Sequence, residues 1–178
     1  MNKSTRRLTQ MAFFVVLQVV LTRFFGITTE INRISFAFVP MALAGAYMGP
    51  GYSALTAIAA DLIGHFLWPK GPYFVGFTIT AALSGALYGV LHKEMSRKER
   101  NVWIVLITLI KRVGLHLGLN TYWLHLLGGK SMQALIVGRY FKTFFLIPID
   151  IAVLVLVFKL LAPHLEKERA HHDFTKGH

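Results

Sequence analysis

The sequence contains no cysteine, so disulfide bonds, thiolate metal ligands and cysteine nucleophiles are all excluded. Acidic residues are also scarce, with 8 Asp and Glu against 19 Lys and Arg, which gives a net charge of +11. In a soluble protein this balance would favour nucleic-acid binding. Basic residues also flank membrane-spanning helices and set their orientation, and this explanation fits the rest of the composition better. We therefore expect no nucleic-acid partner.

Polar side chains are too few to cover a soluble domain, because 54% of the 178 residues are hydrophobic and the mean hydropathy is +0.53. A membrane-spanning helix needs roughly 20 mostly apolar residues, so six such helices would use about 120 residues. Only short connections would remain. We therefore predict an all-α membrane protein: one domain, residues 1–178, folded as a compact bundle of six transmembrane helices in contact with lipid.

Six apolar segments are separated by polar or turn-forming residues, such as Gly49-Pro50-Gly51. The predicted spans are residues 8–25, 34–48, 52–67, 73–91, 102–119 and 134–161. The basic N-terminus has no small-x-small cleavage motif after it, so we interpret the first span as a retained helix. We expect a loop with some helical character over residues 120–133, and the charged tail from residue 166 follows the last span.

Lys and Arg are divided unevenly between the two ends of these spans, which predicts the orientation. The richer side collects Lys3, Arg6, Arg7, Lys93, Arg97, Lys98, Arg100, Lys159, Lys167, Arg169 and Lys176. Positive charge accumulates on the cytoplasmic side of membrane proteins. An even number of spans then places both termini in the cytoplasm, in a multi-pass protein of the cell membrane.

Ionisable side chains inside a membrane are costly and usually face a cavity or a partner. Asp61 lies in the third span, with His65 one turn later. The Asp61 carboxylate either forms an internal ion pair or a helix-capping contact, or it accepts hydrogen bonds from a ligand. Arg139 and Lys142 are three residues apart and so share a helical face. They either extend to the membrane interface or clamp a ligand carboxylate.

Two further pairs of cations flank or enter the predicted spans. Arg23 and Arg33 bracket the first outer loop and add to the same positive field as the pair in the last span. Lys111 and Arg112 fall within the fifth span, where they either face a partner or extend inward. The sequence pattern does not explain why charged residues occur there.

Aromatic residues gather toward the outer side, where they form either an interfacial belt or a stacking surface for a flat ring. They are Phe36, Trp68, Tyr73, Phe74, Phe77, Tyr122, Trp123 and Tyr140. Enzyme motifs are incomplete: residues 128–131 mimic the end of a phosphate-binding loop, but Leu124 stands where its first glycine belongs. The histidines are scattered. We therefore predict no enzyme activity, no metal site and no cofactor.

Several short motifs, in this order and spacing, resemble the substrate-binding S components of energy-coupling factor (ECF) transporters. They are Arg33-Ile34-Ser35-Phe36-x-Phe38-Val39-Pro40, Gly45-x-x-x-Gly49-Pro50-x-x-Ser53, Asp61-x-Ile63-Gly64 and Gly71-Pro72-Tyr73-Phe74-x-Gly76-Phe77-Thr78. The folate-specific branch of that family is suggested by Leu119-Asn120-Thr121-x-Trp123-Leu124 and Arg139-x-x-Lys142 with Pro148. The resemblance covers nearly the whole chain, from the first predicted span to the sixth.

This resemblance implies a small bundle that binds folate from outside the cell and delivers it through a shared module. The implied partners are a transmembrane coupling (T) component and two ATPases, which would hydrolyse ATP in place of this chain. The candidate substrate-binding residues are Arg23, Arg33, Phe36, Asp61, His65, Phe74, Phe77, Asn120, Trp123, Arg139 and Lys142.

Folate chemistry suits these residue types. The donor–acceptor edge of the pterin suits a carboxylate or an amide, which Asp61 and Asn120 offer. The aminobenzoyl ring suits aromatic or apolar walls, and the two carboxylates of the glutamate tail suit Arg and Lys.

Other functions remain open. Within the same family the ligand could be another vitamin such as riboflavin or pantothenate, whereas the positive outer cluster disfavours cationic thiamine. A membrane-embedded enzyme would need a polar constellation, and only Asp61 with His65 and Asp150 are candidates for one. A stand-alone channel or secondary carrier often shows an inverted repeat, and no repeat is evident.

Overall fold

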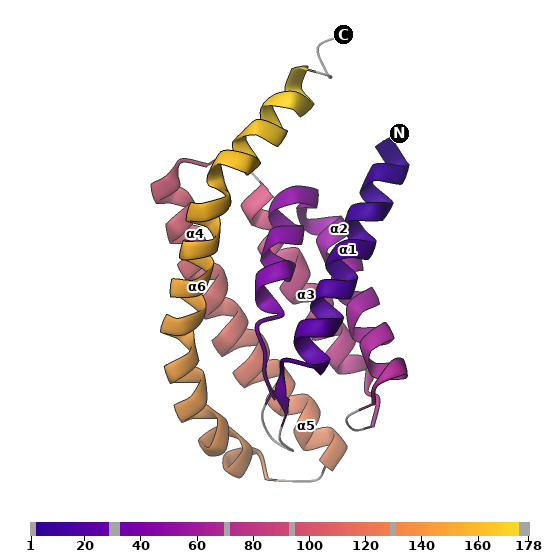
Figure 1. The fold of residues 1–178 in the computed structure, drawn as a ribbon. Helices are drawn as coiled ribbons and strands as arrows, with labels where there is room; N and C mark the ends of the chain where they lie inside the picture. Colours follow the sequence, from indigo (N-terminus) through magenta and orange to yellow (C-terminus); the bar gives the residue numbers. More distant parts are fainter. Residues whose placement is uncertain (1–2, 29–32, 70–71, 93–94, 129–130, 175–178) are drawn as a thin grey trace.

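The computed structural model describes residues 3–28, 33–69, 72–92, 95–128 and 131–174 of the chain. These residues form a bundle of helices, with the beginning of the first helix and the end of the last at the same end of the bundle (Figure 1). The helices are α1 (Lys3–Arg23), α2 (Phe38–Leu67), α3 (Val75–Tyr88), α4 (Arg97–Leu109), α5 (Asn120–Gly128) and α6 (Met132–Phe174).

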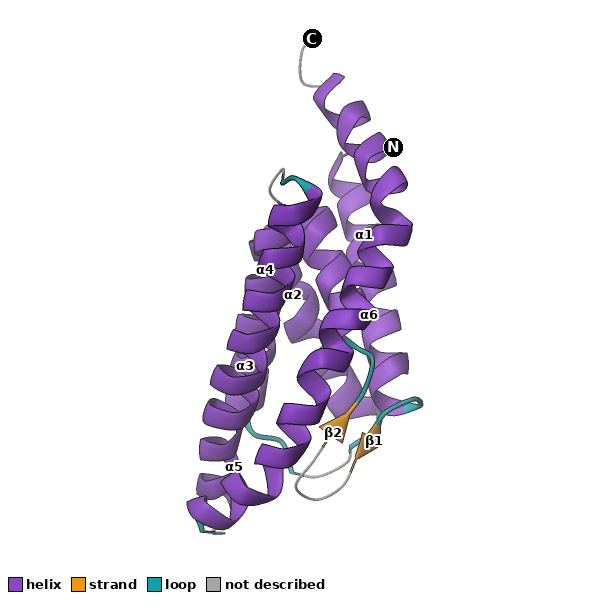
Figure 2. Cartoon of the chain, turned by 90° about the vertical axis from the view of Figure 1, so that its left-hand side faces the viewer, coloured by secondary structure: helices purple, strands orange, loops and turns teal. Residues whose placement is uncertain are grey.

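Two short helices of other types extend this set. A 3-10 turn, η1 (Gly89–His92), continues α3, and a π-helix, η2 (Ile110–Leu119), joins α4 to α5. Strands β1 (Ile27–Thr28) and β2 (Arg33–Ile34) pair antiparallel, with Ile27 opposite Ile34. Figure 2 shows this hairpin and α5 at the end of the bundle away from the termini.

Helix α2 is two antiparallel limbs joined by a tight reversal. Gly49 at its centre has φ 80° and ψ 178°, a conformation that favours glycine, and Pro50 follows it. The Ser53 hydroxyl donates to the carbonyl oxygen of Met41 at 3.5 Å, although twelve residues of straight helix would separate them by roughly 18 Å. The limbs correspond to the second and third predicted spans, and α4, η2 and α5 form one continuous segment, Arg97–Gly128, that corresponds to the fifth. The predicted bundle of six helical segments is therefore confirmed.

The limbs of α2 pack against α3 almost backbone to backbone. A Cβ atom on Gly45 would lie 2.5 Å from the carbonyl of Tyr88, and one on Gly85 would lie 2.6 Å from the carbonyl oxygen of Ser53. Small residues at these crossings allow the close approach. Beside this contact lies a core formed by Phe38, Ala42, Ala46, Tyr88, Leu91, Ile104, Ile107, Leu154 and Phe158.

Helices extend further than the predicted spans at both ends of the fifth and sixth segments. Helix α4 begins at Arg97 because Ser96 and Glu99 form a capping box: the Ser96 hydroxyl accepts from the Glu99 amide, and the Glu99 carboxylate accepts from the Ser96 amide. Residues 120–128, expected as a loop with some helical character, form helix α5. Helix α6 continues past Leu161 to Phe174.

Three stretches of the described helices are long and apolar enough to cross a membrane. They are Val75–His92, Arg97–Gly128 and Leu135–Leu161.

Candidate ligand-binding site

Asp61 on the second limb of α2 ties three elements together. Its Oδ2 accepts a 2.8 Å hydrogen bond from the Thr78 hydroxyl on α3. The hydroxyls of Thr78 and Tyr73 are in turn 3.1 Å apart. Arg23, at the end of α1, lies within electrostatic range of Asp61 and packs against Gly64, where an added Cβ would be 3.0 Å from the arginine Nε. The carboxylate therefore has internal partners before any ligand arrives.

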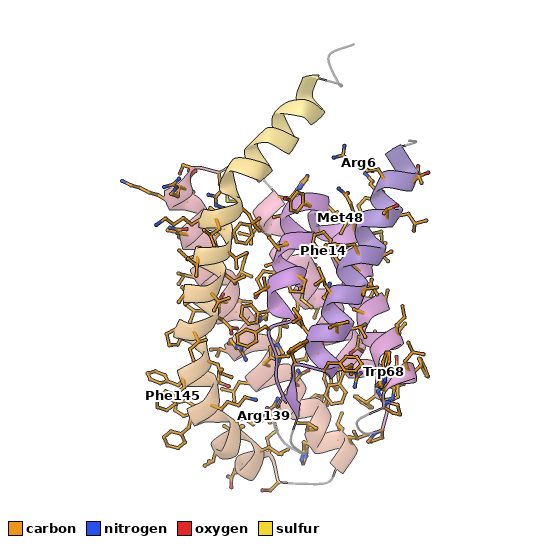
Figure 3. The ribbon with its side chains drawn as sticks, viewed as in Figure 1. Arg6, Phe14, Met48, Trp68, Arg139 and Phe145 are labelled. Atoms are coloured by element: carbon orange, nitrogen blue, oxygen red, sulfur yellow. The ribbon has the colours of Figure 1, made fainter. Side chains whose placement is uncertain are left out.

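His65 belongs to an aromatic group at the C-terminal end of α2. Its ring centroid lies 5.2 Å from that of Tyr73, and Phe66 lies 5.7 Å from the same tyrosine. Trp68, labelled in Figure 3, packs edge-on against Phe24, the residue that follows α1, with ring centroids 5.4 Å apart. This group resembles the aromatic belts found at membrane interfaces.

Phe74, Phe77 and Trp123 form an aromatic wall between α3 and α5. The ring of Phe74 lies 5.9 Å from Phe77 and 5.6 Å from Trp123. Gly76 makes the wall possible, because a Cβ there would lie 2.5 Å from Trp123 Cδ2. The indole N–H of Trp123 donates to the Thr80 hydroxyl at 3.3 Å.

Asn120 offers a buried acceptor. Its side-chain nitrogen lies 3.3 Å from Nδ1 of His116, one turn earlier. Its Oδ1 is buried and has no hydrogen-bond partner among the described residues. A buried acceptor without a partner costs about 1–3 kcal/mol, so a ligand that donates a hydrogen bond would be stabilised here.

Arg139 lies on the part of α6 far from the C-terminal end of that helix (Figure 3). It is half-buried, and one of its NH groups donates to the Thr121 hydroxyl at 2.9 Å. Lys142, one turn further along, is also half-buried. Both cations lie within electrostatic range of His116, so positive charge is concentrated next to Asn120.

The two halves of the predicted site meet at Trp123. Asp61, His65 and Phe74 belong to the α2–α3 side, and Asn120, Arg139 and Lys142 to the α5–α6 side. Trp123 contacts the first side through Phe74 and Thr80.

Two predicted residues are less connected to this arrangement. Phe36 is 49% exposed and packs near Phe38, with ring centroids 6.2 Å apart. Arg33 has its backbone in β2, and its side chain lies outside the described residues.

Sequence reasoning missed the hydroxyl and imidazole groups that hold these side chains. Thr78 binds Asp61, Thr80 binds Trp123 and Thr121 binds Arg139, while His116 lies against Asn120. The available signal was the occurrence of hydroxyl residues inside or beside otherwise apolar runs.

Lys111 and Arg112, which the sequence pattern left unexplained, have partners inside the bundle. Arg112 donates two hydrogen bonds to Asp150 of α6, from Nε to Oδ2 and from NH2 to Oδ1, both at 2.7 Å. Lys111 donates to the Tyr88 hydroxyl at 2.8 Å and lies 3.6 Å from Asp150 Oδ2.

Comparison with known proteins gives consistent matches along most of the chain. The family model of the ECF transporter substrate-specific component matches residues 6–158. The chain is 36% identical over 153 residues to the folate transporter FolT of Clostridium novyi, covering 85% of this chain and 87% of that protein. It is 32% identical over 157 residues to FolT of Leuconostoc mesenteroides, covering 84% and 82%. A crystal structure of FolT bound with folic acid is similar at a TM-score of 0.79 and 34% identity, covering 86% of this chain and 92% of that one.

Proposed function

The chain belongs to the family of ECF transporter substrate-specific components, and we propose that it captures folate at the outer face of the membrane for uptake. The observation that carries this proposal is the similarity to FolT bound with folic acid, which extends over 86% of the chain at a TM-score of 0.79. Two relatives at 36% and 32% identity are also named folate transporters.

Folate fits the chemistry of the outer half of the bundle. The buried Oδ1 of Asn120 can accept from the N–H edge of the pterin, and Asp61 offers a second acceptor at the α2–α3 side. Phe74, Phe77 and Trp123 provide an apolar wall for the ring systems.

The glutamate tail of folate carries two carboxylates, which Arg139 and Lys142 would bind. Arginine can hold a carboxylate through two parallel hydrogen bonds. Arg23, Arg33, Phe36 and His65 remain proposed members of the same site, at its outer rim.

The proposed membrane arrangement has six spans within a single domain and both termini in the cytoplasm. It is supported by the six helical segments, by the common end at which α1 begins and α6 ends, and by the basic residues near that end. The outer end then contains α5, the β hairpin and the aromatic group around Tyr73.

Transport would require partners, because this chain is the binding component. We assign energy coupling to a separate T component and two ATPases, and no ATP hydrolysis to this chain. The incomplete phosphate-binding pattern at residues 128–131 supports this division. Co-expression with such a module should yield a complex that accumulates folate in vesicles only when ATP is supplied.

Folate titration of the detergent-purified protein by calorimetry tests the binding function. Arg139→Ala and Asp61→Ala should each weaken binding by at least about tenfold, since hydrogen bonds to charged groups contribute about 1.5–3 kcal/mol. Tyr52→Phe is a matched control, because Tyr52 contacts Arg7 near the other end of the bundle. Unchanged affinity in both site variants would reject this site. Binding of riboflavin or pantothenate without folate would favour the alternative ligands.

A further inference from the structure

Four polar residues form a buried network beneath the proposed ligand site. Lys111 and Arg112 come from η2, Asp150 from α6 and Tyr88 from α3, and their exposed fractions are 3%, 9%, 1% and 0%. The Lys111 ammonium also lies 4.9 Å from the ring centroid of Phe38 and 5.0 Å from that of Tyr88. The network therefore joins the first limb of α2, α3, η2 and α6.

Charged groups at such depth are costly unless their hydrogen bonds are satisfied within the protein. Both oxygens of Asp150 are bound by Arg112, and Lys111 is held by a hydroxyl, a carboxylate and two aromatic faces. These groups are thus committed to one another. The network is suited to fixing the position of helices and poorly suited to direct contact with a ligand.

The network clamps the start of an unusual helix. A π-helix is generally a single wide turn within an α-helix and often occurs at functional sites, whereas η2 runs for ten residues. Lys111 and Arg112 are its second and third residues. His116 follows one turn later, and Asn120 begins the helix that carries Trp123.

Relaxation of η2 to an α-helix would change its hydrogen-bond spacing from five residues to four. Every residue beyond it would then rotate about the helix axis. Asn120 Oδ1 and the Trp123 ring would leave their present directions, and Thr121 would move away from Arg139.

We propose that Asp150, Arg112, Lys111 and Tyr88 form a positioning network that holds η2 in its wide form and so directs Asn120 and Trp123 at the ligand. The inference rests on the proposed folate-binding function. In this inference the four network residues affect binding by positioning Asn120 and Trp123, and they make no contact with folate themselves.

Four variants test this role. For each, calorimetry measures the affinity for folate and for pteroate, which lacks the glutamate tail, and the Tm of the ligand-free protein is also measured. Asp150→Asn breaks the ion pair. The triple change Lys111→Met, Arg112→Met and Asp150→Leu removes all the charges, a replacement that often leaves stability unchanged or raises it. Tyr88→Phe removes one hydroxyl. Thr108→Val is the control, because its buried hydroxyl on α4 has no hydrogen-bond partner among the described residues.

The positioning role predicts that Asp150→Asn lowers both the Tm and the folate affinity. The triple variant should have a Tm close to that of the wild type. It should still bind both folate and pteroate at least about tenfold more weakly than the wild type does, by the same factor for the two ligands. Tyr88→Phe should weaken both ligands by about threefold and lower the Tm, because the buried Lys111 ammonium loses a hydrogen-bond acceptor. Thr108→Val should bind both ligands with wild-type affinity, and its Tm should be unchanged or higher because a buried hydroxyl without a described partner is replaced by a methyl group.

Wild-type affinity in the triple variant would reduce the network to a structural role and overturn the inference. A loss confined to folate would also overturn it, because Lys111 and Arg112 would then bind the carboxylate tail directly. If the triple variant does not fold, Tyr88→Phe decides: unchanged affinity overturns the inference, and an equal loss for both ligands supports it. Failure of the wild type to bind folate would instead refute the proposed function.

Discussion

Replacing Gly76 with alanine should weaken folate binding by displacing the aromatic wall between α3 and α5. The added methyl carbon would lie 2.5 Å from Trp123 Cδ2 and 2.6 Å from Phe74 Cε1. Carbon atoms pack at about 3.5–4.0 Å, so each ring must retreat by roughly 1 Å. Overpacking of this kind costs about 1–3 kcal/mol. Trp123 would also lose its hydrogen bond to Thr80, a contribution of about 1 kcal/mol.

Part of this free-energy cost lowers the stability of the protein, and part lowers its affinity for folate. We expect the Kd for folate to rise about 10- to 100-fold, which corresponds to about 1.4–2.8 kcal/mol. Calorimetry gives the Kd, and quenching of tryptophan fluorescence on folate addition reports on Trp123 directly. Gly51→Ala is the matched control, since a Cβ there meets no atom within 4 Å. That change should raise stability by up to about 1 kcal/mol and leave the affinity unchanged.

A Kd within about twofold of the wild-type value in Gly76→Ala would refute this reasoning. It would mean either that the rings yield without cost to binding or that folate does not touch them. Equal losses in Gly76→Ala and Gly51→Ala would point to a general effect of helix stiffness instead.

Three other changes have distinct expected outcomes. Arg139→Gln should weaken folate more than pteroate, which lacks the glutamate tail, and equal losses in calorimetry would contradict the assignment of the tail to Arg139. Asn120→Leu should leave the Tm nearly unchanged, because the cost of its unpartnered acceptor offsets the lost contact with His116. The same variant should bind folate at least about tenfold more weakly, and wild-type affinity would remove Asn120 from the site. Ser96→Ala should lower stability by about 1 kcal/mol through loss of the capping box, with unchanged folate affinity, and a loss of affinity would link the far end of α4 to the site.

The helical segments could be predicted from the sequence because lipid imposes long apolar runs and polar interruptions. Gly49-Pro50 marked the reversal within α2, and the structure has its left-handed residue at Gly49. The length of α6 could not be read in the same way. Hydropathy marks where a segment can leave the membrane at Leu161, whereas backbone hydrogen bonding continues the helix to Phe174.

The candidate site could be predicted as a set of residue types and only partly as a set of contacts. Charges within apolar runs attract attention because they are costly in lipid. Helical periodicity relates residues three or four positions apart, as for Arg139 and Lys142. It says nothing about Arg112 and Asp150, which are 38 positions apart. The π-helical form of η2 has no marker in the hydrophobic pattern, so the direction of Asn120 could not be predicted either.

The balance of charge beside His116 bears on which vitamin the site prefers. Lys111, Arg112, Arg139 and Lys142 all lie within its electrostatic range. Asp150 engages the first two, and the described hydrogen bond of Arg139 goes to the uncharged hydroxyl of Thr121.

Opposite unit charges 4 Å apart attract by about 4 kcal/mol at an effective dielectric constant of 20. In the proposed site, folate would bring two carboxylates to Arg139 and Lys142, whereas pantothenate would bring one and riboflavin none. The carboxylates should therefore contribute most of the discrimination among these vitamins, and high salt should weaken it only slightly because half-buried charges are poorly screened.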